Sequence, residues 1–299
     1  MIQKKRPWSD SVSFDPRWKP NGRLARHRPY FFYEDDDLAP CDPQGFRVPT
    51  GHLSIAQKYQ ETKPSEQVFC YGGSTTFGVY CSYDDAYPAQ LERLINRPCF
   101  NMGLQTLDLY GSYLNFVDHL RVGLVPEVAV FLDGVNENQG FIQSVEDNSH
   151  DYAAEFRQYR GFRDLILNAS IKHRFMRYFL NTASEKHNNK SSDPYRFVYE
   201  QAQHYHLSRR AIEKIACAFG FRVVFLLQPC VWDVWEDGAD DPRYVYLKAL
   251  YKEILRQPDH GITDISSEVS LVPECFYDWA HINSEGNAAL AETIALKIL

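Results

Sequence analysis

Apolar and polar residues follow one another in two different rhythms from about residue 67 onwards. Short, continuous apolar runs are typical of strands buried on both faces of a parallel sheet, whereas apolar residues three and four apart are typical of amphipathic helices. The strands predicted in this way are residues 67–71, 99–102, 127–132, 222–228 and 262–265. The predicted helices are residues 84–96, 107–122, 195–219, a helix that follows the loop 229–242 and ends near 256, and residues 284–299.

This alternation of strands and helices predicts an α/β fold with a doubly wound, mostly parallel, five-stranded sheet that carries helices on both faces. In such sheets, ligands bind beyond the carboxyl ends of the strands. Ser74, Gly103 and Asn136 follow the first three predicted strands, and the loop 229–242 follows the fourth. We therefore expect these residues to lie along one edge of the sheet.

Residues 1–65 show neither rhythm and are rich in proline, arginine and aromatic residues, with an acidic run at 34–37. We interpret them as an N-terminal extension packed on the body of the protein, with short strands expected near 30–33 and 46–48. The regular pattern starts at about residue 66 and continues to residue 299, without internal repeats.

Composition narrows the class of protein and its partners. The 299 residues are 44% hydrophobic and 24% charged, and the formal net charge of −7 argues against nucleic acid or an anionic membrane as the main partner. No run reaches the roughly 18 apolar residues of a membrane span, and the basic N-terminus lacks the apolar stretch of a signal peptide. The seven cysteines form no CxxC pair, so neither a zinc site nor a disulfide framework is indicated. We expect a reduced, cytoplasmic protein without a metal or cofactor.

The stretch VFCYGGSTTFG, residues 68–78, ends a predicted strand on two glycines and then presents a serine. Gly/Ser clusters often form tight turns, because glycine adopts backbone angles that other residues avoid. The alternative is that the glycines expose Ser74 as a nucleophile. A serine hydroxyl needs a base within hydrogen-bonding distance for that role.

His281 is the histidine best placed to be this base. It lies just before the C-terminal helix, in FYDWAHINSEGN, three residues after Asp278. This spacing lets the carboxylate reach the imidazole, fix its tautomer and stabilise its protonated form. The D-x-x-H spacing also arises by chance, so it indicates a catalytic pair only in combination with other motifs.

Two residues are candidates for stabilising an oxyanion. The backbone N–H of Gly103 can approach a substrate without an intervening side chain, and the Asn136 amide can donate a hydrogen bond. A strand-to-helix turn at Gly103 and a loop cap at Asn136 are the structural alternatives.

Four motifs occur in a fixed order: GGS at 72–74, N-x-G at 101–103, G-x-N at 134–136 and D-x-x-H at 278–281. Together they resemble the SGNH (GDSL-type) hydrolase superfamily. The resemblance extends from about residue 68 to the C-terminus.

The resemblance implies a three-layer α/β/α domain of the flavodoxin-like kind and a metal-free mechanism through an acyl-enzyme. Ser74, Asp278 and His281 would form the catalytic triad. The Ser74 N–H, the Gly103 N–H and the Asn136 side chain would hold the oxyanion.

The chain also departs from the family pattern. Gly73 and Glu137 stand where many members carry aspartate, and Thr76 replaces the last glycine of a G-x-S-x-G elbow, which disfavours an α/β-hydrolase. Residues 139–194 would interrupt the domain as a mainly helical insertion. Together with residues 1–65, this insertion is expected to decide the substrate.

Further substrate contacts are expected from the loops at the strand ends, which carry specificity in this architecture. The loop 229–242 holds Trp232 and Trp235 among acidic residues, and indole rings pack well against sugar rings or flat apolar groups. The alternative is that one of the two tryptophans packs into the core. Glu137 and Asn138, which follow the G-x-N motif, complete the set of predicted substrate contacts.

The leading interpretation is a serine esterase that hydrolyses a short-chain O-acyl ester, such as an acetyl ester, of a small molecule or carbohydrate through an acyl-Ser74 intermediate. Transfer of the acyl group to an alcohol or amine would use the same residues and stays open. A catalytically silent binding module on this fold is the third interpretation, which the complete set of Ser74, Asp278 and His281 disfavours.

Overall fold

A computed structural model describes the chain over residues 18–19, 32–33, 41–42, 45–49, 51–52, 54–138, 194–235, 241–257 and 261–299. The predicted insertion at 139–194 lies outside the described residues except for its last position. Two short strands, β1 (Trp18–Lys19) and β2 (Phe32–Tyr33), pair with each other in antiparallel fashion. The strand expected near 46–48 is reduced to an isolated bridge between Cys41 and Arg47.

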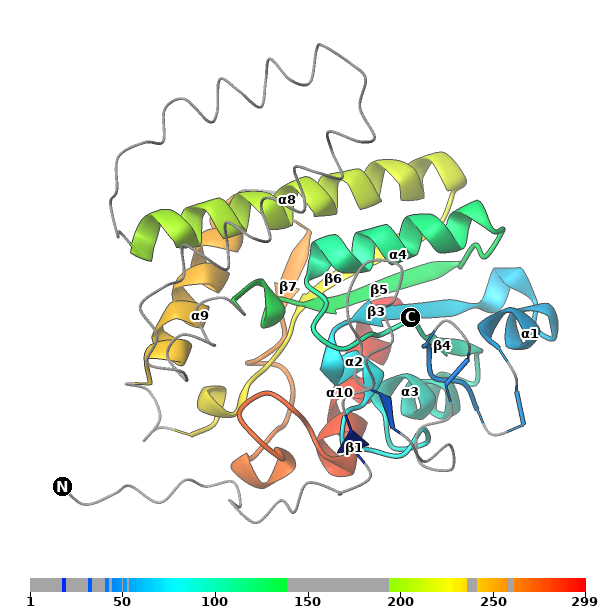
Figure 1. Ribbon diagram of the computed structural model, residues 1–299, viewed down its shortest axis with the longest axis horizontal. Coiled ribbons are helices and arrows are strands. Elements are labelled where there is room, and N and C mark those ends of the chain that lie inside the picture. Colours follow the sequence, from blue (N-terminus) through cyan, green and yellow to red (C-terminus); the bar gives the residue numbers. More distant parts are fainter. Residues whose placement is uncertain are drawn as a thin grey trace, which may run out of the picture.

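The body of the protein is built on a five-stranded sheet (Figure 1). Its strands are β3 (Val68–Gly72), β4 (Cys99–Asn101), β5 (Val128–Asp133), β6 (Arg222–Leu227) and β7 (Ile262–Asp264). The spatial order is β4-β3-β5-β6-β7, and every neighbouring pair is parallel. In chain order this is the 2-1-3-4-5 arrangement, which confirms the predicted doubly wound α/β fold with a sheet that is parallel throughout.

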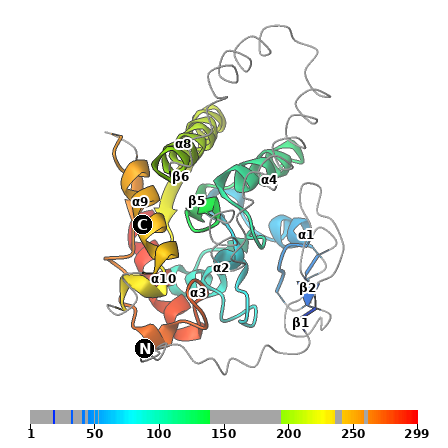
Figure 2. The same ribbon diagram turned by 60° about the vertical axis from the view of Figure 1, so that its left-hand side comes forward.

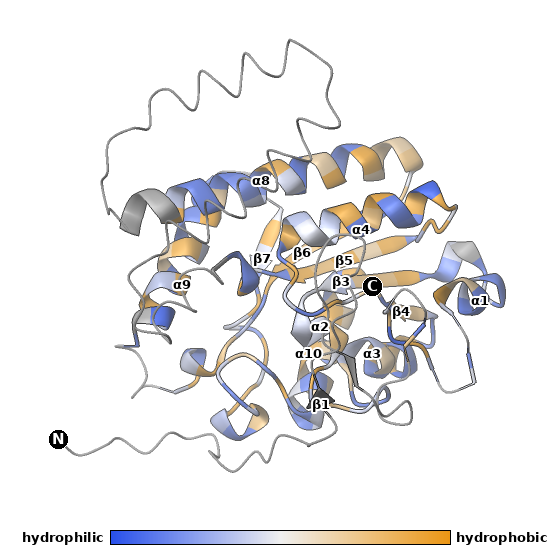
Figure 3. Ribbon diagram, in the orientation of Figure 1, coloured by the Kyte–Doolittle hydropathy of each residue, from blue (hydrophilic) through white to orange (hydrophobic). Residues whose placement is uncertain are grey.

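The central strands have no polar face because both faces of the sheet are covered. All residues of β3, β4 and β5 are buried, and Figure 3 shows β3 and β5 as apolar along most of their lengths. Aromatic rings line up across three neighbouring strands: Tyr71 stacks on Phe131 with ring centroids 4.9 Å apart, and Phe131 stacks on Phe225 at 5.3 Å. This burial explains why the strands appear in the sequence as continuous apolar runs.

Helices cover both faces of the sheet, so the domain has three layers, with the sheet in the middle (Figures 1 and 2). The longer helices are α3 (Tyr87–Ile95), α4 (Leu109–Arg121), α8 (Pro194–Phe219), α9 (Pro242–Ile254) and α10 (Ser284–Ile298). Helices α4 and α8 lie side by side over one face, with α9 against α8, while α3 and α10 pack together on the other face (Figures 1 and 2). Among the described helices, none combines the length and apolar character needed to cross a bilayer.

Shorter helical turns connect these elements. They are α1 (Ile55–Gln60) and α2 (Ser74–Phe77), and the 3₁₀ turns η1 (Pro64–Glu66), η2 (Asn136–Asn138), η4 (Val231–Asp233) and η6 (Pro273–Cys275). Two of them, α2 and η2, follow directly on strands β3 and β5 and begin with predicted site residues.

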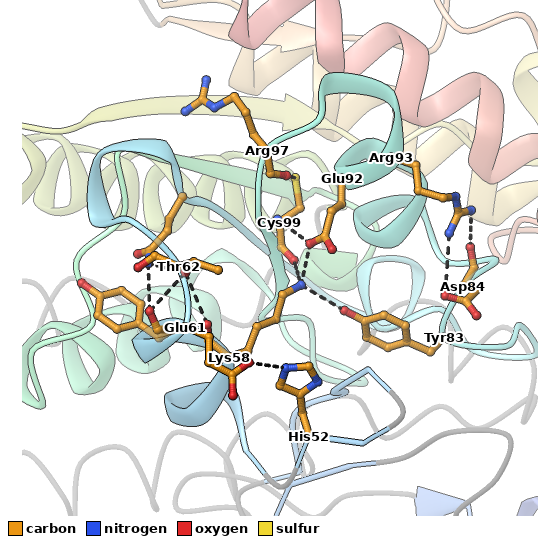
Figure 4. A network of polar contacts seen from close by, with 12 residues as sticks. His52, Lys58, Glu61, Thr62, Tyr83, Asp84, Glu92, Arg93, Arg97 and Cys99 are labelled. Atoms are coloured by element: carbon orange, nitrogen blue, oxygen red, sulfur yellow. Dashed lines mark hydrogen bonds and ion pairs between the residues drawn. The ribbon is translucent and has the colours of Figure 1, made fainter.

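The described residues just before the sheet are tied firmly to it. Phe46, Val48 and Ile55 are buried in the main hydrophobic core. Lys58 of α1 is also buried, and its ammonium group donates hydrogen bonds to Glu92 on α3 and to the carbonyl of Cys99 on β4 (Figure 4). A buried ammonium group is retained only where such partners replace its water.

Candidate active site

Ser74 stands at the carboxyl edge of the sheet, as the first residue of α2 directly after β3. The glycine before it is required by a close approach from a neighbouring strand end. A Cβ atom at Gly73 would lie 2.0 Å from Nδ2 of Asn136, which no side chain could tolerate. Gly73 therefore makes room for the Asn136 amide beside Ser74.

Three predicted side chains form one hydrogen-bonded chain. The Ser74 hydroxyl lies 2.8 Å from Nε2 of His281. On the other side of the ring, Nδ1 of His281 lies 2.6 Å from Oδ2 of Asp278. All three residues are partly exposed, so this chain can be reached from solvent.

The segment 278–281 is held against the strand ends by its own backbone. The carbonyl of Ala280 accepts hydrogen bonds from the Gln228 side chain at 3.0 Å and from the Thr75 hydroxyl at 3.3 Å. Gln228 follows β6 and Thr75 belongs to α2, so side chains from two different elements donate hydrogen bonds to the same carbonyl group. No sequence pattern indicates these two contacts, because polar residues at strand ends have many possible partners.

The electrostatics of the pair favour an ionised aspartate. Burial alone would raise the pKa of Asp278, but the charge and hydrogen bond of His281 and the backbone N–H groups of Ala280 and His281, each 2.8 Å from Oδ1, lower it below the ordinary value of 3.8. Because an ionised carboxylate only accepts, Nδ1 of His281 must carry a hydrogen, and Nε2 then presents its lone pair to the Ser74 hydroxyl.

Gly103 packs against the end of α2, the helical turn that begins with Ser74. A Cβ atom there would lie 2.4 Å from the backbone nitrogen of Phe77, so this position also requires glycine. Its N–H donates to Oδ1 of Asn101 at 3.1 Å, while Nδ2 of Asn101 donates to the carbonyl of Phe77 at 3.2 Å. The structure thus brings Gly103 beside α2, with its N–H engaged by Asn101.

Asn136 begins η2 after strand β5, next to Gly73. Its Nδ2 group donates a hydrogen bond to the carbonyl of Leu107 at 2.7 Å. This contact orients the amide and fixes its nitrogen, rather than its oxygen, on the side of the site. The Asn136 amide nitrogen therefore lies close to Gly73, the residue before Ser74.

Glu137 was expected to contact substrate, but the structure gives it a different role. The side chain is buried, and its carboxylate oxygens accept the backbone N–H groups of Leu109 at 2.7 Å and Gly134 at 2.8 Å. It thereby joins the turn after β5 to the first residue of α4. Burial and the nearby Asp108 carboxylate raise its pKa to about 7, against the effect of the backbone hydrogen bonds. Asn138, the other predicted contact here, is the last residue of η2.

The two tryptophans of the loop after β6 are placed differently from each other. Trp232 is only 3% exposed, and its ring stacks on Trp279 with centroids 5.1 Å apart. The Arg243 guanidinium lies 4.9 Å from the centre of the Trp232 ring. Trp232 is therefore a core residue, as the alternative interpretation had it, whereas Trp235 is half-buried and packs at the edge of the core.

One aromatic residue near the site was missed in the sequence. Tyr80 adopts the left-handed backbone region, with φ at 68°, which is uncommon for a bulky side chain. Its ring meets the His281 ring edge to face at a centroid distance of 5.3 Å. Burial, and then the charge of Asp278, raises its pKa to about 12. A single tyrosine in a loop carries no signal of this kind.

In the part of the chain that the structure describes, no three His, Cys, Asp or Glu side chains gather as a metal site requires. No protein-family model and no curated protein matches the sequence.

Solved structures similar to this chain include GDSL/SGNH lipolytic proteins and acetyl esterases. An acetyl xylan esterase is 11% identical over 78% of this chain and 100% of its own, with a TM-score of 0.46. A member of the lipolytic G-D-S-L family from Veillonella parvula is 13% identical over 78% of this chain and 97% of its own, with a TM-score of 0.43. A carbohydrate acetylesterase family member from Sinorhizobium meliloti is 16% identical over 78% and 97%, with a TM-score of 0.41.

Proposed function

We propose that this protein is a serine esterase of the SGNH type, with Ser74 as nucleophile, His281 as general base and Asp278 as the group that orients the base. The observation that carries the proposal is the continuous hydrogen-bonded chain from Ser74 Oγ through the His281 ring to Asp278 Oδ2, with distances of 2.8 and 2.6 Å. A nucleophile, a base and a third group in this geometry form the arrangement that activates a serine hydroxyl.

The proposed reaction has two halves. Ser74 Oγ attacks the ester carbonyl carbon, and its proton moves to Nε2 of His281. The tetrahedral intermediate collapses, the bond to the alcohol oxygen breaks, and that oxygen takes the proton from His281. A water molecule then attacks the acyl-Ser74 carbonyl while His281 accepts its proton, and the carboxylic acid leaves as Ser74 regains its hydrogen.

The negative charge on the tetrahedral oxygen needs preorganised donors. We assign this role to the Ser74 N–H and the Asn136 side-chain amide, whose nitrogen lies beside Gly73. Gly103 N–H is the third proposed donor. Since it donates to Asn101 Oδ1 in the structure, it would share its hydrogen between that oxygen and the oxyanion, or change partner when substrate binds.

The proposed substrate is a short-chain O-acyl ester, such as an acetyl ester, of a small molecule or carbohydrate. The Tyr80 ring packs edge to face on the His281 ring, with centroids 5.3 Å apart, and so borders the proposed site. The size of the acyl group is the part of the proposal that substrates can test. Initial rates on p-nitrophenyl esters of increasing chain length, alongside acetylated sugars, test this directly. A rate that rises steadily with chain length would contradict it.

Labelling with a fluorophosphonate probe tests the nucleophile. We expect one label per wild-type chain, located on Ser74 by mass spectrometry, and none on Ser74→Ala. Ser82→Ala is the matched control, since its hydroxyl lies on the following loop and bonds to Asp85 instead of a histidine. Absence of label from folded wild type would favour the silent binding module. Product analysis with and without an added alcohol separates hydrolysis from acyl transfer.

A further inference from the structure

Arg47 precedes the sheet in the chain, and its guanidinium group lies at the C-terminal end of α2, the helical turn that begins with Ser74. The side chain is fully buried. Its Nη1 donates to the carbonyls of Phe77 at 3.1 Å and Gly78 at 3.0 Å, and its Nη2 donates to the carbonyl of Cys81 at 3.0 Å. A buried guanidinium is costly unless its hydrogens find acceptors, so this interaction with three backbone carbonyls is a specific feature of the fold.

The Phe77 carbonyl belongs to a helical turn that cannot stabilise itself, Gly78 caps that turn, and Cys81 lies three residues further on. Helix α2 is four residues long, Ser74–Phe77, and it ends at Gly78 in the left-handed region. A helix of one turn lies below the length at which helices persist without external contacts, and its last carbonyls have no partner within the helix. The positive charge of Arg47 supplies donors at the end of α2 where the helix dipole is negative.

The same turn fixes the backbone of Ser74. The N–H groups of Gly78 and Val79 both donate to the carbonyl of Ser74, at 3.0 and 3.1 Å. Arg47 therefore bonds to the carbonyls of the same two peptide groups, Phe77–Gly78 and Gly78–Val79, whose N–H groups bond to Ser74. A shift of the Gly78 peptide would be passed directly to the nucleophile.

Arg47 also shares an acceptor with Asn101, two residues before Gly103. The Phe77 carbonyl receives both Nη1 of Arg47 and Nδ2 of Asn101, and Asn101 in turn accepts the Gly103 N–H. The Phe77 carbonyl at the end of α2 thus links Arg47, through Asn101, to Gly103, a proposed oxyanion donor.

The segment that carries Arg47 is itself anchored on both sides. Asp42 accepts the backbone N–H of Phe46 at 3.0 Å and that of Ile55 at 3.3 Å. Phe46 and Val48, the neighbours of Arg47 in sequence, are buried in the core. The backbone on both sides of Arg47 is therefore fixed in place, and this fixes the position from which its side chain extends.

We infer that Arg47 is a positioning residue that sets the Ser74 hydroxyl relative to His281, so that the short stretch around Arg47, residues 45–49, supports the catalytic geometry. This inference rests on the proposed function, in which Ser74 is the nucleophile. It assigns Arg47 no contact with substrate.

A matched control exists in helix α1, which follows the stretch that carries Arg47. Lys58 is a second buried cation, 5% exposed, and its ammonium group bonds to Glu92 and to the carbonyl of Cys99, away from α2 (Figure 4). Lys58→Met removes a buried cation and its hydrogen bonds just as Arg47→Met does. The two variants should lose stability alike, but only one should disturb Ser74.

The experiment compares wild type, Arg47→Met, Arg47→Lys and Lys58→Met at a temperature where each is folded by circular dichroism. Reactive Ser74 is counted by titration with the fluorophosphonate probe, and the inactivation rate constant, kcat and KM are then expressed per reactive site. We expect Arg47→Met to lower kcat and the inactivation rate constant by about 10–10²-fold, as misplacement of a reacting group does, with KM changed little. Arg47→Lys should be intermediate, because one ammonium group cannot reproduce the planar fork of donors. Lys58→Met should stay within twofold of wild type.

Each result decides the matter. Per-site rates of Arg47→Met equal to wild type, or lowered no more than those of Lys58→Met, would overturn the inference. If Arg47→Met does not fold, Arg47→Lys decides by the same comparison, and failure of both to fold would show a purely structural role and overturn it as well. Failure of the proposed function looks different, because wild type itself would then not react with the probe.

Discussion

The Ser74 hydroxyl and Nε2 of His281 lie 2.8 Å apart, although 207 positions separate the two residues in the chain. Ser74 follows the first strand of the sheet and His281 precedes the last helix, so their meeting depends on the whole domain. The pair is also supported by shared contacts, since Thr75 and Gln228 both donate to the carbonyl of Ala280, the residue before His281.

Removal of a triad side chain should abolish turnover without unfolding the protein. We expect Ser74→Ala and His281→Ala each to lower kcat by roughly 10⁴–10⁶-fold, and Asp278→Asn by less, because the carboxylate orients the base and does not react. The double variant Ser74→Ala/His281→Ala should be little worse than the worse single one, since the residues act as a unit. Steady-state kinetics check these values, with circular dichroism as the folding control. Near-normal activity in pure Ser74→Ala would rule out the mechanism.

Asn136→Ala should lower kcat by roughly 10²–10³-fold with little change in KM, as expected for a donor that acts in the transition state. The alternative role, a cap that holds the loop through the Leu107 carbonyl 2.7 Å away, predicts a lower melting temperature with per-site kcat preserved. Both quantities should be measured on the same preparation. A preserved kcat would remove Asn136 from the oxyanion site.

Glu137 should make stability depend on pH. Its pKa is raised from 4.5 to about 7 in the folded protein, so its stabilising contribution is complete below about 4.5 and is lost as the pH rises through about 7. Glu137→Gln cannot titrate. We therefore expect the free energy of unfolding of wild type to fall relative to this variant by on the order of 1–3 kcal/mol across that window. Urea unfolding at several pH values measures the difference, and a difference that does not change with pH would contradict the prediction.

The two tryptophans of the 229–242 loop should respond differently to truncation. Trp232→Ala removes a core ring stacked on Trp279 and should lower the free energy of unfolding by about 3–5 kcal/mol. Trp235→Ala, at a half-buried position, should instead raise KM for the best acetylated sugar far more than for p-nitrophenyl acetate. Thermal melts and paired KM values separate the two effects. Equal KM changes on both substrates would place Trp235 outside the substrate site.

The sequence by itself determined the architecture. Continuous apolar runs separated by amphipathic helices are produced by a parallel sheet covered on both faces, and the observed strands β3 to β6 lie within one or two residues of the predicted ranges. The carboxyl ends of parallel strands share one edge, so residues that follow the strands could be expected to converge. Ser74 and Asn136 were found in this way, and the short spacing of Asp278 and His281 suggested their pairing.

Helix boundaries were predicted less well where a local contact overrides periodicity. The helix expected from residue 84 begins at Tyr87, with a proline in its first turn. Asp85 instead belongs to a turn, in which it accepts the Ser82 hydroxyl and Ser82 accepts the Asp85 N–H. Proline is well suited to a first helical turn because it needs no intrahelical partner for a backbone N–H.

Only the tertiary structure decided which polar and aromatic side chains serve the site and which serve the fold. Glu137 was expected at the substrate and is buried between two backbone N–H groups. For Trp232 the sequence left both a substrate contact and a core position open, and the structure places the ring in the core. No role was predicted for Arg47, which lies in an irregular, arginine-rich segment, yet it donates hydrogen bonds to carbonyls 30 to 34 positions away. Periodicity reports burial of apolar surface, which is repeated along an element, whereas a hydrogen bond between distant residues occurs once and leaves no pattern in the sequence.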